Sequence, residues 1–476
     1  MDNKETLIPQ TKNKNDIKAL FIHVTAAVYA FLIFAFNFSR IFDNNFWGDE
    51  AYSINLIRKG LIPILTETAS DVHPPLYYLL LMALYRVFGA RGWVYHFAAI
   101  IPFAAVLIFA VTFFYKRFGK EAAFILITLV GFSDNAAIYN VEVRMYSLAF
   151  MFVLFSYYSL YRILEDEKNA WIFFVIFSLG AAYTHYYALL TVGFFYLSLL
   201  IFTIRKKIEL KRFLLICGCT IAGYLPWAVK FLSTFGRTTG SYWMTEVPGI
   251  KDIIKYFFLA ENKWYSYGML ALTFIMLGFF IYKDRFLTEK STWLICGVAA
   301  TLGTVIMGVA VSYAFRPVFT LRFIYPAVSL VWVILAVSIS GLKPGKILAP
   351  VVVCLSLFFY VPVFMQTCSY ERAIDEIRSD TEAVINVNVE SGDLIITNGE
   401  HLDWTILDYY VPRASHMYSE NLNAIPAHTG TTYLFWTDPL TDEEKAVLKL
   451  GGKEAVPVME NGLIGNWVRI YRLDPL

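Results

Sequence analysis

The sequence predicts a helical protein that crosses a membrane many times and ends in a small soluble domain with both helices and strands. Hydrophobic residues make up 58% of the 476-residue chain and charged residues 16%, whereas a soluble protein is about 45–50% apolar. Apolar stretches long enough to cross a bilayer recur up to Met365, and the composition becomes that of a soluble protein from Ser369 onward. The net charge of +2 gives no reason to expect a nucleic-acid partner.

The N-terminal 18 residues are polar and carry four lysines, so we expect 1–18 to be a cytoplasmic tail. The apolar stretch 19–38 follows without a small-residue cleavage pattern, which favours a retained anchor over a removed signal peptide. Ten further stretches have the length and apolar character expected of membrane spans: 93–115, 122–139, 146–164, 170–183, 186–204, 213–232, 264–282, 292–313, 323–340 and 347–365.

Basic breaks between these stretches indicate cytoplasmic loops; they lie at 116–120, 205–207, 283–290 and 343–346. Placing all of them on the side of the N-terminal tail requires that 76–88, which is short for a span, does not cross. We expect 76–88 to be a helix in the outer interface, because Pro74 and Pro75 suit a helix start. The prediction is then about eleven spans, with everything after Met365 outside.

We therefore expect a transmembrane domain at 19–367, with juxtamembrane helices in an outer loop at 39–92, and an extracytoplasmic α/β domain at 368–476. Helical patterns in this last domain alternate with strand-like runs, which suggests a small parallel or mixed sheet. The helices are expected at 370–386, 404–410 and 441–450, and the strands at 394–397, 432–436 and 467–471. The five cysteines show no metal-ligand spacing and are interpreted as packing residues.

An acidic pair, Asp49-Glu50, follows the first apolar stretch and is flanked by aromatic residues. Carboxylates at the mouth of a membrane helix are costly and usually functional, although most Asp-Glu pairs on loops are simply solvated. Desolvation beside a bilayer improves a carboxylate as a base. We predict that Asp49 is a general base for an acceptor hydroxyl, and that Glu50 caps the helix, orients a partner or binds a metal.

Two further outer segments carry side chains suited to a phosphate. His73 precedes Pro74-Pro75, and a protonated imidazole there would contact a phosphate. Asp71 would hold this imidazole, share a metal site with it or cap a helix. Arg144 presents a planar fork that suits phosphate and needs an anionic partner near a bilayer, which is either Glu142 or a lipid phosphate.

Arg316 and Arg322 stand near the mouth of the stretch 323–340, where they would neutralise a phosphate leaving group. Their alternative role is to reach lipid headgroups. Arg322 is the better candidate because it stands directly at the helix entrance. His185 and Tyr186 are weaker candidates, since tyrosines at an interface usually serve as anchors. The sequence assigns no particular cofactor; a divalent metal, if one takes part, would be held by Asp49, Glu50, Asp71 and His73.

Together these motifs resemble the GT-C superfamily of membrane glycosyltransferases, in the protein-mannosyltransferase-like group that includes dolichyl-phosphate-mannose protein mannosyltransferases and the aminoarabinose transferases of lipid A. The likeness spans roughly residues 20–340 and lies in the motifs at 48–52, 73–78, 144–147, 184–186 and 322–326. One departure is His73-Pro74 preceded by Val72, where the aminoarabinose transferases carry Lys-Pro preceded by Glu. Because of this departure, the substrate and the metal site of the aminoarabinose transferases are not assigned to this sequence.

The resemblance implies an inverting transfer of a sugar from a polyprenyl-phosphate donor, with Asp49 as general base and a lipid phosphate as leaving group. We expect the acceptor to be a glycan, a lipid or a protein, and the reaction to take place at the outer face of the inner (plasma) membrane. The alternative function is a transporter or flippase of lipid-linked sugars. Transporters tend to place charges in broken helices at mid-membrane, often in two related halves, whereas the candidate charges here cluster at one expected face.

Overall fold

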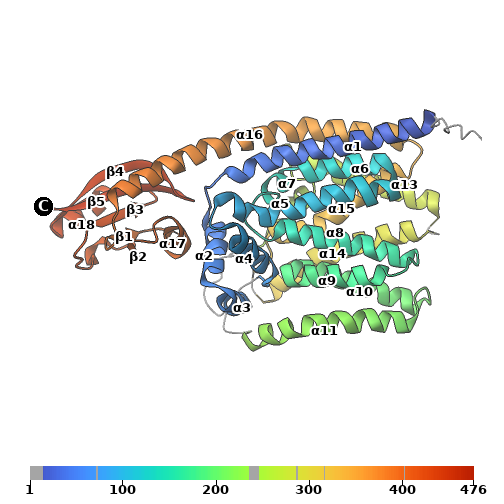
Figure 1. Ribbon diagram of the computed structural model, residues 1–476, viewed down its shortest axis with the longest axis horizontal. Coiled ribbons are helices and arrows are strands. Elements are labelled where there is room, and N and C mark those ends of the chain that lie inside the picture. The colour runs from blue at the N-terminus through green and yellow to red at the C-terminus, as the bar shows by residue number, and fades with distance from the viewer. Residues whose placement is uncertain (1–13, 71–72, 235–245, 286–287, 316, 401) are drawn as a thin grey trace, which may run out of the picture.

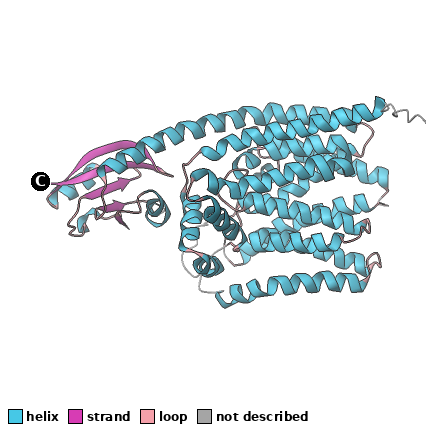
Figure 2. Cartoon of the chain, viewed as in Figure 1, coloured by secondary structure: helices cyan, strands magenta, loops and turns pink. Residues whose placement is uncertain are grey.

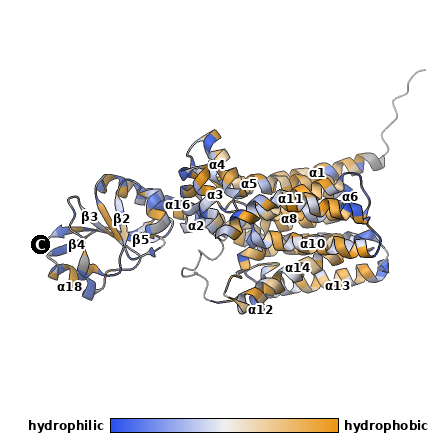
Figure 3. Cartoon of the chain, turned by 90° about the horizontal axis from the view of Figure 1, so that it is seen from below, coloured by the Kyte–Doolittle hydropathy of each residue, from blue (hydrophilic) through white to orange (hydrophobic). Residues whose placement is uncertain are grey.

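A long helical bundle carries a small sheet domain at one end in the computed structural model, which describes residues 14–70, 73–234, 246–285, 288–315, 317–400 and 402–476 (Figures 1 and 2). The bundle contains α1 (Lys14–Phe38), α5 (Gly92–Phe109), α6 (Tyr115–Phe132), α8 (Tyr146–Leu164), α9 (Ala170–Thr184), α10 (Tyr186–Ile204), α11 (Leu210–Thr234), α13 (Lys263–Asp284), α14 (Glu289–Ala314), α15 (Tyr325–Ser340) and α16 (Gly345–Asn388). Hydrophobic residues dominate these helices (Figure 3), so the fold is that of a multi-pass membrane protein.

Nine helical segments within the described residues are long and apolar enough to cross a membrane. One of them, Gly92–Phe132, contains the π-helical segment η2 (Ala110–Phe114) and bends at Gly119, whose φ of 89° lies in the left-handed region. Because of this bend, α5 and α6 lie side by side in the bundle (Figure 1). The apolar helix α9 is shorter, at 15 residues, and packs on α8. The count of about eleven crossings stays a prediction.

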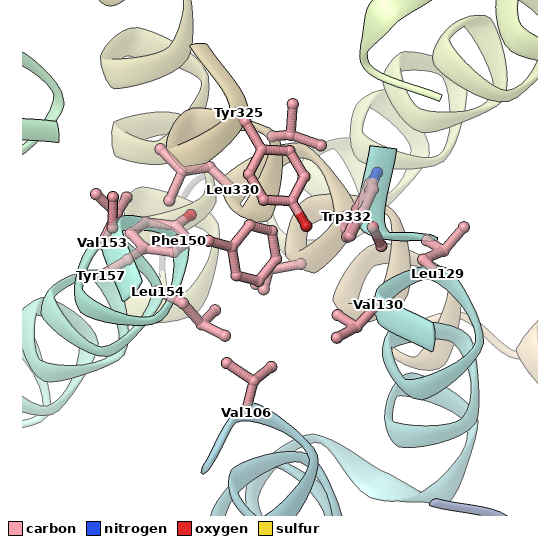
Figure 4. Packing of buried hydrophobic residues seen from close by; sticks show 14 of the residues in the cluster. Val106, Leu129, Val130, Phe150, Val153, Leu154, Tyr157, Tyr325, Leu330 and Trp332 are labelled. Atoms are coloured by element: carbon pink, nitrogen blue, oxygen red, sulfur yellow. The ribbon is translucent and has the colours of Figure 1, made fainter. Parts of the chain in front are cut away.

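Helix α15 forms the centre of the bundle, where it packs against α6, α8, α13 and α14. Nearly all of its residues are buried, as expected for a helix that is apolar on every face. Phe150 of α8 stacks on Tyr325 and packs against Trp332 (Figure 4). The Trp332 indole donates a hydrogen bond of 2.8 Å to the carbonyl of Phe257, so its one polar atom is satisfied inside the apolar core.

Short helices cover the end of the bundle that faces the sheet domain (Figure 1). They are η1 (Ser39–Phe42), α2 (Gly48–Lys59), α3 (Leu61–Ser70) and α4 (Leu76–Phe88), with α7 (Asp134–Tyr139), α12 (Ile250–Tyr256) and η3 (Leu321–Ile324) in the connections between bundle helices. Helix α4 begins after Pro75 and ends at Gly89, whose φ is 84°. The expected stretch 122–139 is divided, because Ser133 ends α6 and caps α7.

Helix α16 runs for 44 residues from the bundle into the C-terminal domain (Figure 1), so the helix expected at 370–386 is its continuation. The five-stranded mixed sheet has the order β2-β1-β3-β5-β4, with parallel pairing among β2, β1 and β3 and antiparallel pairing among β3, β5 and β4. Its elements are β1 (Leu394–Thr397), η4 (Leu402–Ile406), α17 (Leu407–Tyr410), β2 (Ser415–Tyr418), η5 (Leu422–Ala424), β3 (Thr432–Trp436), α18 (Asp442–Leu450), β4 (Lys453–Leu463) and β5 (Trp467–Pro475).

The sequence analysis missed β2 and β4, the two edge strands of the sheet. Neither is a continuous apolar run: β2 is partly exposed, and β4 carries Pro457, which an edge strand tolerates. The three strands that were expected, β1, β3 and β5, lie between them. The apolar pattern therefore located the interior of the sheet and not its edges.

Candidate active site

The first turn of α2 places Asp49 and Glu50 in different surroundings. Glu50 is buried, and its two carboxylate oxygens accept hydrogen bonds from the backbone N–H of Val143 at 2.7 Å and of Trp47 at 3.3 Å. The second of these bonds caps the helix. Desolvation raises the pKa of Glu50 well above its ordinary value, and the nearby carboxylate of Glu142 raises it further. Glu50 thus joins α2 to the turn before α8.

Asp49 lies between two arginine side chains and remains accessible. Its Oδ2 accepts a hydrogen bond of 2.9 Å from Nη1 of Arg322 and lies 3.7 Å from Nη2 of Arg144. Arg144 also donates through Nη1 to the Asp49 carbonyl at 3.1 Å and to Ser53 Oγ at 3.2 Å. The Asp49 side chain is 32% exposed, against 4% for Arg144, so a substrate hydroxyl can reach this carboxylate. The desolvated surroundings expected for Asp49 belong instead to Glu50.

Glu142 does not form the ion pair with Arg144 that the sequence offered as one alternative. Within the described residues, the carboxylate paired with Arg144 is Asp49, because Glu142 turns toward the indole of Trp47 and accepts a hydrogen bond of 3.2 Å from it. Its second oxygen, Oε2, is buried and has no hydrogen-bond partner in the described part of the chain. Burial raises the pKa of Glu142 to about 7, although Arg144 and Arg322 oppose this shift.

Two histidines that the sequence separates by more than 100 residues lie together behind Asp49. The ring centroids of His73 and His185 are 5.2 Å apart, and both rings pack on Phe323, the residue after Arg322. Both histidines are buried. His185 caps α10 by accepting a hydrogen bond of 3.1 Å from the Tyr187 backbone N–H at Nδ1. The site thus draws together segments that precede α4, α10 and α15.

The surroundings of His73 in the substrate-free chain disfavour the protonated imidazole that the sequence led us to expect. Burial lowers the pKa of His73 well below its ordinary value, and the positive charges of Arg144 and Arg322 and the neighbouring His185 lower it further. Burial also lowers the pKa of His185, to about 3. Both shifts favour the neutral imidazole in the substrate-free chain, and a neutral His73 can still offer a ring N–H to a phosphate.

Tyr146, Trp47 and Ser53 also line the site, although the sequence analysis did not select them. The Tyr146 ring lies 5.9 Å from that of His185, and its hydroxyl is buried without a hydrogen-bond partner in the described residues. The signal for Tyr146 was present, because it belongs to the same motif as Arg144. Tyr186, by contrast, packs its ring against Phe231, with centroids 5.1 Å apart.

Asp71 and Arg316 fall outside the described residues. Across the described ranges, no group of three or more His, Cys, Asp or Glu side chains could hold a metal ion. Asp49 and Glu50 also face different partners, since arginines contact the first and backbone N–H groups the second.

An apolar cavity of about 740 Å³ opens between α12, α13, α14 and α15. Its walls include Ile253, Phe274, Leu302, Val305 and Ile334. Helix α12 packs against η3, which carries Arg322. The cavity and the charged site are therefore adjacent parts of one region, the first suited to a hydrocarbon chain and the second to an anionic group.

Comparison with known proteins gives a family match for part of the chain and a fold match for nearly all of it. Residues 72–229 match the model of the family described as dolichyl-phosphate-mannose-protein mannosyltransferase. No curated protein matches the sequence. The structure is similar to crystal structures of ArnT from Cupriavidus metallidurans.

The apo form of that protein superposes with a TM-score of 0.64 at 10% sequence identity, covering 97% of this chain and 98% of ArnT. The form bound to undecaprenyl phosphate gives a TM-score of 0.60 at 12% identity, covering 94% of this chain and 97% of ArnT. At this identity the similarity establishes the fold. The GT-C type of fold that the sequence motifs led us to expect is thereby confirmed.

Proposed function

We propose that this chain, which has an ArnT-like GT-C membrane glycosyltransferase fold, transfers a sugar from a polyprenyl-phosphate-linked donor to an acceptor hydroxyl, with Asp49 as general base. The observation that carries the proposal is the accessible carboxylate of Asp49 held between Arg322 and Arg144 at one end of the membrane bundle. This arrangement joins a proton acceptor to two anion-binding groups, which are the parts that such a transfer needs.

The reaction balances with the side chains of the site. The acceptor oxygen attacks the anomeric carbon of the sugar while its proton passes to Asp49, and the bond between that carbon and the phosphate oxygen breaks. Polyprenyl phosphate leaves with the bonding electron pair. A direct displacement of this kind inverts the anomeric configuration. Arg322 and Arg144 stabilise the negative charge that develops on the phosphate.

Donor binding would also release the base. Arg322 contacts Asp49 at 2.9 Å in the substrate-free chain, and a phosphate is a competing partner for the same guanidinium group. When Arg322 binds the donor phosphate instead of Asp49, the Asp49 carboxylate becomes available to the acceptor hydroxyl. A neutral His73 beside Arg322 can donate one ring N–H to the same phosphate.

The apolar cavity near η3 can bind the polyprenyl chain of the donor. Its lining is almost entirely hydrocarbon, and an isoprenoid chain gains free energy by leaving water for such a surface. ArnT, the structural relative, has been crystallised with undecaprenyl phosphate, which supports a lipid of this class as the carrier. We also propose an orientation in the membrane. The site and the C-terminal domain face the outside of the inner membrane, and the N-terminus faces the cytoplasm.

A transporter of lipid-linked sugars is a poorer description of these features. Transporters bind their substrate near the bilayer midplane, whereas Asp49, Arg144 and His73 lie in the short segments at one end of the bundle. A glycosyltransferase needs a carboxylate such as Asp49 as a general base, whereas transport of a lipid-linked sugar gives the acidic pair no chemical role.

The experiment that tests the proposal is sugar transfer by the purified full-length Asp49→Asn variant with a polyprenyl-phosphate donor. We expect transfer to fall by about 100-fold to 10,000-fold, which is what general-base catalysis typically contributes. Asp380→Asn, the same chemical change at an exposed position of α16, is the control and should leave transfer unchanged. Normal transfer by Asp49→Asn would remove Asp49 as the base.

Mass spectrometry of envelope glycolipids and glycans from cells with and without the gene would identify the acceptor. A sugar missing from one glycan, lipid or protein of the deleted strain names the acceptor class. An unchanged envelope would count against transfer to any of these.

A further inference from the structure

The C-terminal domain contacts α2 along one side of the helix. Ala51, Asn55 and Arg58 are four and three positions apart, so they share a helix face. Ala51 is buried in the hydrophobic core of the C-terminal domain. Asn55 donates a hydrogen bond of 2.8 Å to the carbonyl of Thr405, and the Arg58 guanidinium lies 4.7 Å from the centroid of the Tyr409 ring. The helix that carries Asp49 is thus partly packed into another domain.

The same domain binds the backbone just before α2. The Tyr410 hydroxyl accepts a hydrogen bond of 2.7 Å from the Phe46 backbone N–H and donates one of 3.0 Å to the carbonyl of Asn44. The backbone N–H of Gly465 donates to the side-chain oxygen of Asn45 at 2.9 Å. Three consecutive residues, 44–46, are therefore fixed by the C-terminal domain shortly before the chain reaches Asp49.

Gly465 allows the two domains to approach this closely. Its φ of +68° is in the left-handed region, and a Cβ atom at this position would lie 2.2 Å from the carbonyl oxygen of Phe46 and 3.3 Å from Cα of Trp47. Real Cβ atoms do not come this close to backbone, so any side chain here would push the domains apart. Trp47 caps α2, and its position is therefore set in part by Gly465.

The opposite side of α2 faces the site. Arg144 contacts the Asp49 carbonyl and Ser53, and Glu50 binds the Val143 backbone N–H. Helix α2 is consequently held between the C-terminal domain and the turn that carries Arg144. We propose that the C-terminal domain positions the catalytic carboxylate: its contacts with residues 44–58 fix α2 in the place where Asp49 meets Arg322 and the acceptor. Only the identification of Asp49 as catalytic rests on the proposed function.

The test compares Gly465→Ala with Gly452→Ala in the purified full-length chain. Gly452 has a similar φ of +70° in the same domain, but a Cβ atom there would meet no atom within 4 Å. Both substitutions strain a left-handed residue, and only the first separates the domains. Tyr410→Phe, which removes the hydroxyl between Asn44 and Phe46 and keeps the ring, is a second variant in case Gly465→Ala does not fold.

Two measurements are made on each variant. Hydrogen–deuterium exchange of residues 44–58 should be faster in Gly465→Ala and Tyr410→Phe than in the wild type and unchanged in Gly452→Ala. For sugar transfer from a polyprenyl-phosphate donor, kcat should fall about tenfold or more in the first two variants, since a misplacement of about 1 Å can cost about 100-fold. The donor KM should change less than about twofold, because the residues that we propose to hold the donor phosphate, Arg322, Arg144 and His73, all lie outside the C-terminal domain.

The outcomes separate this inference from the proposed function. Absence of sugar transfer by the wild type would contradict the proposed function, while the exchange measurement would still decide whether the C-terminal domain fixes α2. Unchanged exchange at 44–58 in folded Gly465→Ala and Tyr410→Phe would overturn the inference. Equal losses of kcat in Gly465→Ala and Gly452→Ala would also overturn it, because they would reflect general strain within the C-terminal domain.

Discussion

Asp49 and Arg322 are 273 positions apart in the chain, yet Oδ2 of the first and Nη1 of the second are 2.9 Å apart. One belongs to the first turn of α2 and the other to η3, the short helix before the central helix α15. Arg144 approaches the same oxygen from a third segment. The pair therefore marks the point where three distant parts of the sequence meet.

Replacement of Arg322 should weaken donor binding according to the charge and shape that remain. We expect Arg322→Gln to raise the donor KM by about 10-fold to 100-fold, since a hydrogen bond to a charged group is worth about 1.5–3 kcal/mol. Arg322→Lys should have an intermediate effect, because lysine keeps the charge but not the planar fork. Steady-state kinetics with varied donor measures both, and the exposed Arg86→Gln is the control. An unchanged donor KM in Arg322→Gln would exclude this residue from the phosphate site.

The carboxyl group of Glu142 should make donor binding depend on pH. Its pKa is about 7, so it gains a negative charge beside Arg144 and Arg322 as the pH rises through neutrality. That charge repels an anionic donor, and the donor KM should therefore rise above about pH 7. Glu142→Gln should remove this rise, which donor kinetics between pH 5.5 and 8.5 can measure. If the donor KM of Glu142→Gln depends on pH in the same way as that of the wild type, Glu142 is not the group that causes the rise.

Glu142 should also make the stability depend on pH, with the opposite sign to a carboxylate whose pKa is lowered by an ion pair. Burial raises the pKa of Glu142 from 4.5 to about 7, so the folded chain binds a proton that the unfolded chain has lost. The stabilisation is complete below about pH 4.5 and is lost as the pH rises toward 7. In thermal unfolding in detergent, Glu142→Gln should show a smaller decrease of the midpoint across this interval than the wild type. The exposed Glu376→Gln should behave like the wild type.

The apolar cavity should discriminate between donors by chain length. Val305 lines it, and Val305→Trp would fill part of the volume that a long isoprenoid chain occupies. We expect kcat/KM for a long-chain donor to fall about tenfold relative to that for a donor with about two isoprene units, because each buried CH₂ contributes about 0.8 kcal/mol. Leu225→Trp, on an exposed side of α11, is the matched control. An equal decrease of kcat/KM for both donors would show that the isoprenoid chain does not bind in this cavity.

Much of the architecture was visible in residue patterns. The strands expected at 394–397 and 432–436 have those same bounds in the structure, because an interior strand must bury both faces and so reads as an apolar run. The edge strand β4 could not be found in this way, since most of its residues are only partly buried or exposed and it contains Pro457. The long helix α16 was expected as two elements, because its first half is apolar and its second half polar, and hydropathy changes at a membrane surface whether or not the helix ends there.

The candidate site was predicted residue by residue but not in its pairing. Asp49 was selected as a carboxylate at the mouth of a membrane helix. Arg144, Arg322 and His73 were selected as side chains that suit a phosphate, and His185 was a weaker candidate. Their residue types could not show that Arg144 pairs with Asp49 rather than with its neighbour Glu142, or that the surroundings of His73 lower the pKa of its imidazole. Both facts depend on burial and on charges brought from other segments.

The sequence by itself determined the membrane class, the small soluble domain and the residues able to carry chemistry. These follow from local composition, because a bilayer selects for the length and hydrophobicity of each segment separately. The tertiary structure alone decided that Asp49 is the half-buried, arginine-bound carboxylate while Glu50 is the fully buried one, and that the C-terminal domain packs on the helix that carries them. Such distinctions arise from distances between segments hundreds of residues apart, which side-chain packing sets and local sequence does not record.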